Sequence, residues 1–259
     1  MSTPPPIAAP VDPKAPSQPG LSEPQRLINT FIAPRKTFED LKRNSRWWVP
    51  WLLGTLAIVA FLYTVEKKVG YEAIINSRFA HASFLQRAVS QMTPEQKQAM
   101  MDKQIAGAGS SLYTTPVVNL IIALIFAALL MATFNFGFDA QVKYKNALAI
   151  VFYGFLPKVV FSLLAIVIMV VGVEPEGFDM ENPVATHLGV LLGYNTDHRY
   201  LYRLLTGIDL FSLWWVFLIG LGFAIVSKTK MSTWAAVTAV GAWYVVFTLL
   251  RVALVPFAG

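Results

Sequence analysis

The sequence predicts an all-α integral membrane protein with five transmembrane helices and a cytoplasmic N-terminus. Two apolar segments near the C-terminus, Leu210–Val226 and Trp234–Val255, are each close to the roughly 20 residues that cross a bilayer as a helix. The connector between them, 227–233, is so short that the two helices must be antiparallel. The composition agrees, because 55% of the 259 residues are hydrophobic and 14% are charged, which is too apolar for an ordinary soluble domain.

The chain begins with a proline-rich segment, residues 1–21. Prolines recur from Pro4 to Pro19, and the apolar residues between them show no periodicity. Such a segment cannot bury enough apolar surface to offset the entropy of ordering. We therefore expect a disordered cytoplasmic tail, and a proline-rich ligand for a partner protein is the alternative.

Residues 22–46 are predicted to form a basic amphipathic helix at the membrane interface. Ser22 and Gln25 make a capping box, and apolar residues then recur at helical spacing around Pro34. The cations of the opposite face are Arg26, Arg35, Lys36, Lys42, Arg43 and Arg46. A basic face beside a span attracts anionic lipid by about 1 kcal/mol per cation near the surface. Docking of this helix on a protein partner is the alternative.

The membrane domain, residues 47–259, is predicted to begin at a cluster of tryptophans. Trp47 and Trp48 precede Pro50, as expected for an aromatic belt at the membrane interface. The first span then covers about residues 49–66. We expect these aromatic side chains to anchor the protein in the interface.

A polar outer loop, residues 67–114, is predicted to hold a helical hairpin outside the membrane. Phe84–Met92 contains one helical apolar face, and Thr93–Gln96 is a capping box that begins a second helix. The small residues of Gly107–Ser110 are expected to end this second helix before the next span.

The remaining spans are expected at about 115–138, 147–172, 208–227 and 232–256, with a second outer loop at 173–207. Lys158 lies near the middle of the third span, where a lysine costs roughly 2.5–3.5 kcal/mol. The apolar residues of that segment contribute about 0.4 kcal/mol each and outweigh this cost. Gly220 and Gly222 in the fourth span predict close helix packing.

The distribution of lysine and arginine predicts the orientation. The last connector contains Lys228 and Lys230 and no acid, so it is expected in the cytoplasm. Lys143 and Lys145 mark the connector between the second and third spans in the same way. Five spans then place the N-terminus inside and the C-terminus outside.

Four short motifs follow one another along the chain. They are Phe31-x-x-Pro34-x-x-x-Phe38, Trp47-x-x-Pro50, Tyr153-Gly154-x-x-Pro157 and Ile208-Asp209-Leu210-Phe211-x-x-Trp214. Their order resembles that of bacterial members of the Yip family, which is named for interaction with Ypt/Rab GTPases. The resemblance implies five membrane helices, no enzymatic activity, and a role as scaffold or adaptor in membrane organisation or trafficking. It also implies a multi-pass protein of the bacterial cytoplasmic (inner) membrane.

Three groups of residues are candidates for function. The candidates for lipid or partner binding are Arg35, Lys36, Lys42, Arg43, Arg46, Trp47 and Trp48. The family motif residues are Tyr153, Gly154, Pro157, Asp209, Phe211 and Trp214. The intramembrane charges are Lys158, Asp209 and Arg251. We expect Asp209 and Arg251 to form an ion pair, because the final hairpin brings them to similar depth. The alternatives are that Asp209 caps the fourth span, or that either charge faces Lys158 or a solute path.

Few residues suit catalysis. The histidines are His81, His187 and His198, none of them in a His-Glu-x-x-His motif, and the chain has no cysteine for thiolate chemistry or zinc binding. We therefore expect no enzyme and no cofactor. An outer metal site formed by His187 and His198 with Glu181 and Asp197 is the alternative.

The expected partners are membrane lipid and either a protein partner or a second copy of the chain. The net charge of +6 does not indicate nucleic acid, because the basic residues cluster at span ends as topology signals. A small transporter or permease subunit that uses the intramembrane charges is the alternative function.

Overall fold

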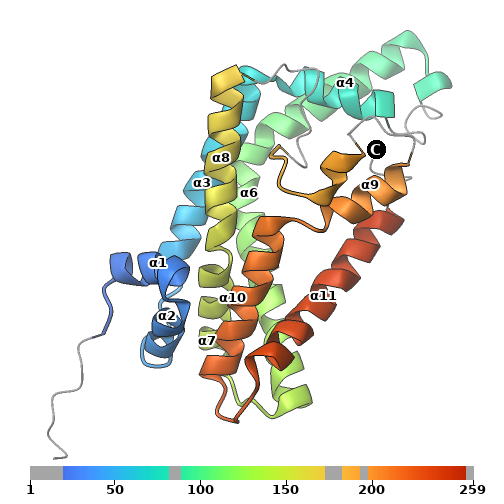
Figure 1. The fold of residues 1–259 in the computed structure, drawn as a ribbon. Helices are drawn as coiled ribbons and strands as arrows, with labels where there is room; N and C mark the ends of the chain where they lie inside the picture. Colours follow the sequence, from blue (N-terminus) through green and yellow to red (C-terminus); the bar gives the residue numbers. More distant parts are fainter. Residues whose placement is uncertain (1–19, 82–88, 173–182, 193–197, 255–259) are drawn as a thin grey trace, which may run out of the picture.

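The protein is an all-helical bundle, seen in a computed structural model that describes residues 20–81, 89–172, 183–192 and 198–254 (Figure 1). The predicted disordered tail lies almost entirely outside the described residues. The same is true of much of the predicted apolar face Phe84–Met92.

The helices of the described residues follow one another along the whole chain. They are α1 (Glu23–Ile32), α2 (Pro34–Leu41), α3 (Trp48–Lys68), α4 (Tyr71–His81), α6 (Pro94–Phe138), α7 (Tyr144–Gly154), α8 (Leu156–Gly172), the 3₁₀ helix η2 (Leu188–Leu191), α9 (Arg199–Thr206), α10 (Leu210–Val226) and α11 (Thr233–Ala253).

Four helical stretches in the described part of the chain are long and apolar enough to cross a membrane. They are Trp48–Lys68, Pro94–Phe138, Tyr144–Gly172 and Thr233–Ala253. These stretches correspond to the first, second, third and fifth predicted spans. The fourth predicted span corresponds to α10, a shorter apolar helix of 17 residues.

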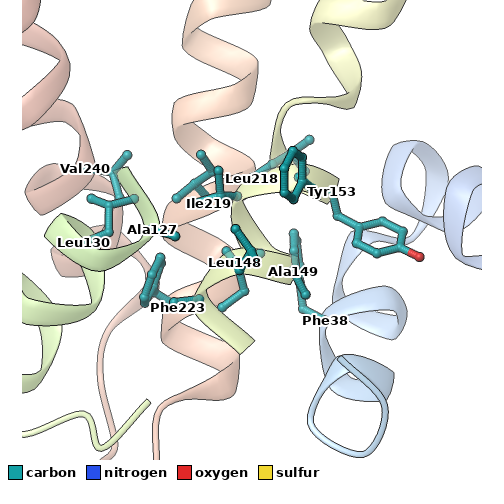
Figure 2. Packing of buried hydrophobic residues seen from close by; sticks show 14 of the residues in the cluster. Phe38, Ala127, Leu130, Leu148, Ala149, Tyr153, Leu218, Ile219, Phe223 and Val240 are labelled. Carbon is teal, nitrogen blue, oxygen red and sulfur yellow. The ribbon is translucent and has the colours of Figure 1, made fainter. Parts of the chain in front are cut away.

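Helix α10 lies at the centre of the bundle, packed against α2, α7, α8 and α11. Leu218, Ile219 and Phe223 are fully buried there, and the ring of Phe223 stacks on Phe134 of α6 at 4.2 Å between centroids (Figure 2). Because this helix contacts protein on most sides, burial in the bundle stabilises it even though it is shorter than a typical span.

The predicted close packing at Gly220 and Gly222 is confirmed. A Cβ added at Gly220 would lie 2.6 Å from the backbone Cα of Val237 in α11. One added at Gly222 would lie 2.6 Å from Ile150 of α7 and 2.9 Å from Phe38 of α2. The absence of a side chain at both positions therefore lets α10 approach three neighbouring helices.

The predicted end of a helix at Gly107–Ser110 is wrong. Helix α6 continues through these residues as one helix of 45 residues, and its first half packs against α4 (Figure 1). Met101 is buried there with Tyr71 and Ile74 of α4 and Val65 of α3. A glycine inside a helix costs only about 1 kcal/mol relative to alanine, and this packing outweighs that cost.

Two other predicted helices are divided in the structure. The amphipathic segment forms two helices, because Pro34 begins α2 after a break at Ala33. The third predicted span breaks at Phe155 between α7 and α8. Pro157 lies in the first turn of α8, where its missing N–H removes no helical hydrogen bond.

Candidate functional site

Helices α1 and α2, here called the amphipathic unit, lie on one flank of the bundle beside α7 and α10 (Figure 1). Phe38 and Leu41 are fully buried in the main hydrophobic core, which also contains Ala149 of α7 (Figure 2). Phe31 contacts the edge of Trp214 in α10, with ring centroids 5.5 Å apart. Phe31, Phe38 and Leu41 of this segment are thus covered by the protein's own helices, whereas Ile28 and Ile32 remain exposed.

A buried salt bridge joins the two helices of the amphipathic unit. Arg26 is 1% exposed, and its Nη2 lies 2.6 Å from Asp40 Oδ2. Its Nη1 lies 3.1 Å from Glu23 Oε1. The prediction that Arg26 belongs to the exposed cationic face is therefore wrong, because two carboxylates hold it inside the unit.

The carboxylate of Asp40 is held in its charged form. Burial raises its pKa, but hydrogen bonds from Arg43 and Arg26 outweigh this effect, so the pKa of Asp40 lies below its ordinary value of 3.8. The bond from Arg43 Nη2 to Asp40 Oδ1 is 2.9 Å long. Asp40 thus links α1 to the end of α2.

Two polar contacts connect the amphipathic unit to α7. The Tyr153 hydroxyl donates to Glu23 Oε2 at 2.8 Å, and Figure 2 shows its ring pointing from α7 toward the unit. The Asn146 side-chain amide donates to the Leu41 carbonyl at 2.8 Å. Beside Tyr153, Gly154 leaves room for Ile219, since a Cβ at Gly154 would overlap that side chain.

The other predicted binding residues form an exposed cationic group on the same flank. Arg35, Lys36, Lys42, Arg43 and Arg46 are all exposed, and we call them the basic surface. Trp48 is 50% exposed, whereas the ring of Trp47 stacks on Phe152 of α7 at 5.4 Å. Trp47 therefore helps to fix the unit on the bundle, and Trp48 is accessible.

A second polar cluster surrounds Asp209 at the start of α10. Its carboxylate accepts the Ser212 amide at 2.8 Å, as an N-cap, and the Thr186 hydroxyl at 2.6 Å. Lys158 Nζ lies 3.7 Å from Asp209 Oδ2 and 2.9 Å from Ser212 Oγ. The capping role and the contact with Lys158, both alternatives in the sequence analysis, are confirmed.

The predicted ion pair between Asp209 and Arg251 is wrong. Asp209 forms its salt bridge with Lys158, and the Arg251 guanidinium donates to Thr206 Oγ1 at 2.9 Å. The segment that contains η2 and α9 lies between α10 and the end of α11, so Arg251 meets this segment first. The other motif residue here, Phe211, is buried against Phe161.

The alternative of an outer metal site has no support in the described residues, which contain no group of three or more possible ligands. Two of its four members, Glu181 and Asp197, lie outside the part that the structure describes. His187 is buried close to Tyr202 of α9, and its ring makes an edge contact with that aromatic side chain.

The fold and the site define the class of protein: it is an α-helical membrane protein in which an amphipathic unit is docked on the apolar bundle. The chain belongs to the Yip1 family, because the Yip1 domain model matches residues 28–253. This match confirms the resemblance seen in the four motifs, all of which lie within the matched residues. A comparison with curated proteins and another with solved structures gave no match.

Proposed function

We propose that this protein is a non-enzymatic membrane scaffold or adaptor that binds anionic lipid and a protein partner or second copy through its amphipathic unit. The docked unit with its exposed basic surface is the observation that carries this proposal. The apolar side chains that would insert into a bilayer include Ile28 and Ile32, which are 58% and 74% exposed. A trafficking-like role in membrane organisation is consistent with membership of the Yip1 family.

Transport is a weaker proposal for the intramembrane charges. Lys158 and Asp209 bind each other, and Arg251 binds Thr206, so each has a role within the fold. No internal repeat supports a transporter architecture. We therefore favour the scaffold.

We further propose that the chain has five spans, with the N-terminus in the cytoplasm, in the inner membrane of a bacterium. Because the natural chain has no cysteine, single cysteines report the orientation without background. We expect a cysteine at Ser110 to react with an impermeant thiol reagent in intact cells and one at Ser232 to be protected. Reaction at Ser232 in intact cells would reverse the proposed orientation.

Replacing Arg35, Lys36, Lys42 and Arg43 by glutamine should weaken binding of anionic lipid to the whole protein. Near a membrane each cation contributes about 1 kcal/mol, so losing four should reduce the apparent affinity by a hundredfold or more. The measurement is a titration of protein in nonionic micelles with phosphatidylglycerol and, separately, with phosphatidylcholine. Thermal stability provides the readout.

A matched control removes the same charge from another part of the chain. Lys67, Lys68, Lys97 and Lys103 are exposed at the far end of α3 and the start of α6. Replacing these four lysines by glutamine should leave most of the thermal stabilisation by phosphatidylglycerol. In the wild type, raised salt should reduce that stabilisation. Equal losses in the two variants would mean that the amphipathic unit has no special role in lipid binding.

A further inference from the structure

A partly open cavity of about 300 Å³ lies between α3, α6 and the α7–α8 junction. It is distinct from the amphipathic unit, and its walls are mostly apolar. Trp51 and Gly54 come from α3, Asn119 from α6, and Phe155 and Lys158 from the junction. This volume is at the lower end of the range for small-molecule sites.

Lys158 places a cation in the wall of this cavity. Fourteen residues separate it from each end of the helical stretch Tyr144–Gly172, or about 21 Å, so its side chain cannot reach either end. The side chain is 42% exposed, and Asp209 lies at 3.7 Å, beyond an ordinary hydrogen bond. Ser212 Oγ accepts one hydrogen bond from the ammonium, which can donate three, so the ammonium can also bind an acceptor that an occupant supplies.

Thr55 and Ser162 are polar residues of the same wall. The amide of Asn119 adds a further polar group to the same wall.

The surroundings of the cavity are suited to an alkyl chain. Leu52 and Leu56 of α3 are 42% and 59% exposed, and Ile122 and Ile125 of α6 are 56% and 64% exposed. In a membrane these side chains contact lipid, so a chain can enter from the bilayer. The Lys158 ammonium selects the other end of the occupant. That end must accept hydrogen bonds, and a negative charge on it favours binding.

We propose that this cavity binds a single acyl chain whose anionic head is held by Lys158. The shared chemistry is a carboxylate or phosphate on an alkyl chain, which a free fatty acid or a membrane phospholipid would supply. The inference does not depend on the scaffold function, because the cavity and the basic surface have no residue in common.

The test is equilibrium binding of radiolabelled dodecanoate to the full chain in nonionic micelles. We expect saturable binding, with dodecanol and dodecyltrimethylammonium competing at least tenfold more weakly than unlabelled dodecanoate. Competition by dilauroyl phosphatidylglycerol at lower concentration than dodecanoate would identify a phospholipid as the source, which also supports the site. Equal competition by dodecanol and dodecanoate would overturn the proposal, because the head would then make no difference.

Two variants locate the binding. Lys158→Met should weaken dodecanoate at least tenfold. Gly54→Leu should abolish binding by filling the cavity, and it should fold, because a Cβ at Gly54 meets only Val159 at an ordinary 3.9 Å. The control is Lys230→Met, an exposed lysine in the last connector. Wild-type affinity in folded Gly54→Leu would place the ligand elsewhere and refute the proposal.

Discussion

Replacement of Arg26 by methionine is expected to detach the amphipathic unit from the bundle and to lower the free energy of unfolding by about 3 kcal/mol. The change removes the cation that binds two carboxylates. The negative charges of Asp40 and Glu23 then lie close together without the positive charge that had offset their repulsion. Asp40 keeps its bond from Arg43, so we expect the lower end of the range for a broken buried pair. Denaturant unfolding in micelles measures the loss, and limited proteolysis of the N-terminal segment reports detachment.

Arg35→Met is the matched control, because Arg35 is an exposed cation on the same unit. Its effect should stay within about 0.5 kcal/mol, as for most surface substitutions. The double variant Arg26→Met with Asp40→Leu should be more stable than Arg26→Met alone, since it removes the unpaired carboxylate. Similar stability of the Arg26 and Arg35 variants would show that the buried salt bridge does not hold the unit.

Acidification should release the same unit. The pKa of Asp40 is lower in the docked state than its ordinary value of 3.8, so its charge stabilises docking at pH values above 3.8. That contribution is lost as the pH falls below 3.8 and through the docked-state pKa, when the carboxylate is protonated. Protease cleavage of the unit should therefore increase in this pH range in the wild type and change less in Asp40→Asn.

Most of the membrane architecture could be predicted because apolar run length is a local property. The first, third and fifth predicted spans each correspond to a stretch of helix long enough to cross a bilayer, and α6 contains the second. The errors lie where tertiary packing decides. The contact of Met101 with α4 keeps α6 helical through Gly107, and no residue near Gly107 in the sequence shows that α4 will be there.

The candidate site could be predicted only in part, for the same physical reason. The sequence distinguishes a basic face from an apolar one, but it does not show which cation a distant carboxylate will bury. Asp40 is 14 residues from Arg26, and Lys158 is 54 residues from Ser212. Helix rotation and the position of the η2–α9 segment decide these contacts. The capping box at Ser22, by contrast, depends on Gln25 only three positions further along the chain and was predicted correctly.

Replacement of Gly220 by leucine is expected to separate α10 from α11 and to lower the free energy of unfolding by about 3 kcal/mol, at the upper end of the usual range for overpacking. A Cβ at this position would lie 2.6 Å from the Cα and 2.7 Å from the N of Val237. Because these are backbone atoms, a rotamer change cannot relieve the clash, and the helices must move apart. Such movement would also disturb the hydrogen bond that Tyr244 of α11 donates to the Gly207 carbonyl.

The same pair of helices provides the control for this prediction. A Cβ at Gly241 of α11 would meet Val216 of α10 at an ordinary 3.9 Å, so Gly241→Ala should be neutral or stabilising by up to about 1 kcal/mol through helix propensity. Gly220→Ala gains the same propensity but introduces the clash, so it should be clearly less stable than Gly241→Ala. Thermal unfolding of both alanine variants in micelles compares them directly. Equal midpoints would mean that α10 and α11 do not pack with their backbones in contact at Gly220, and the central position of α10 would then be in question.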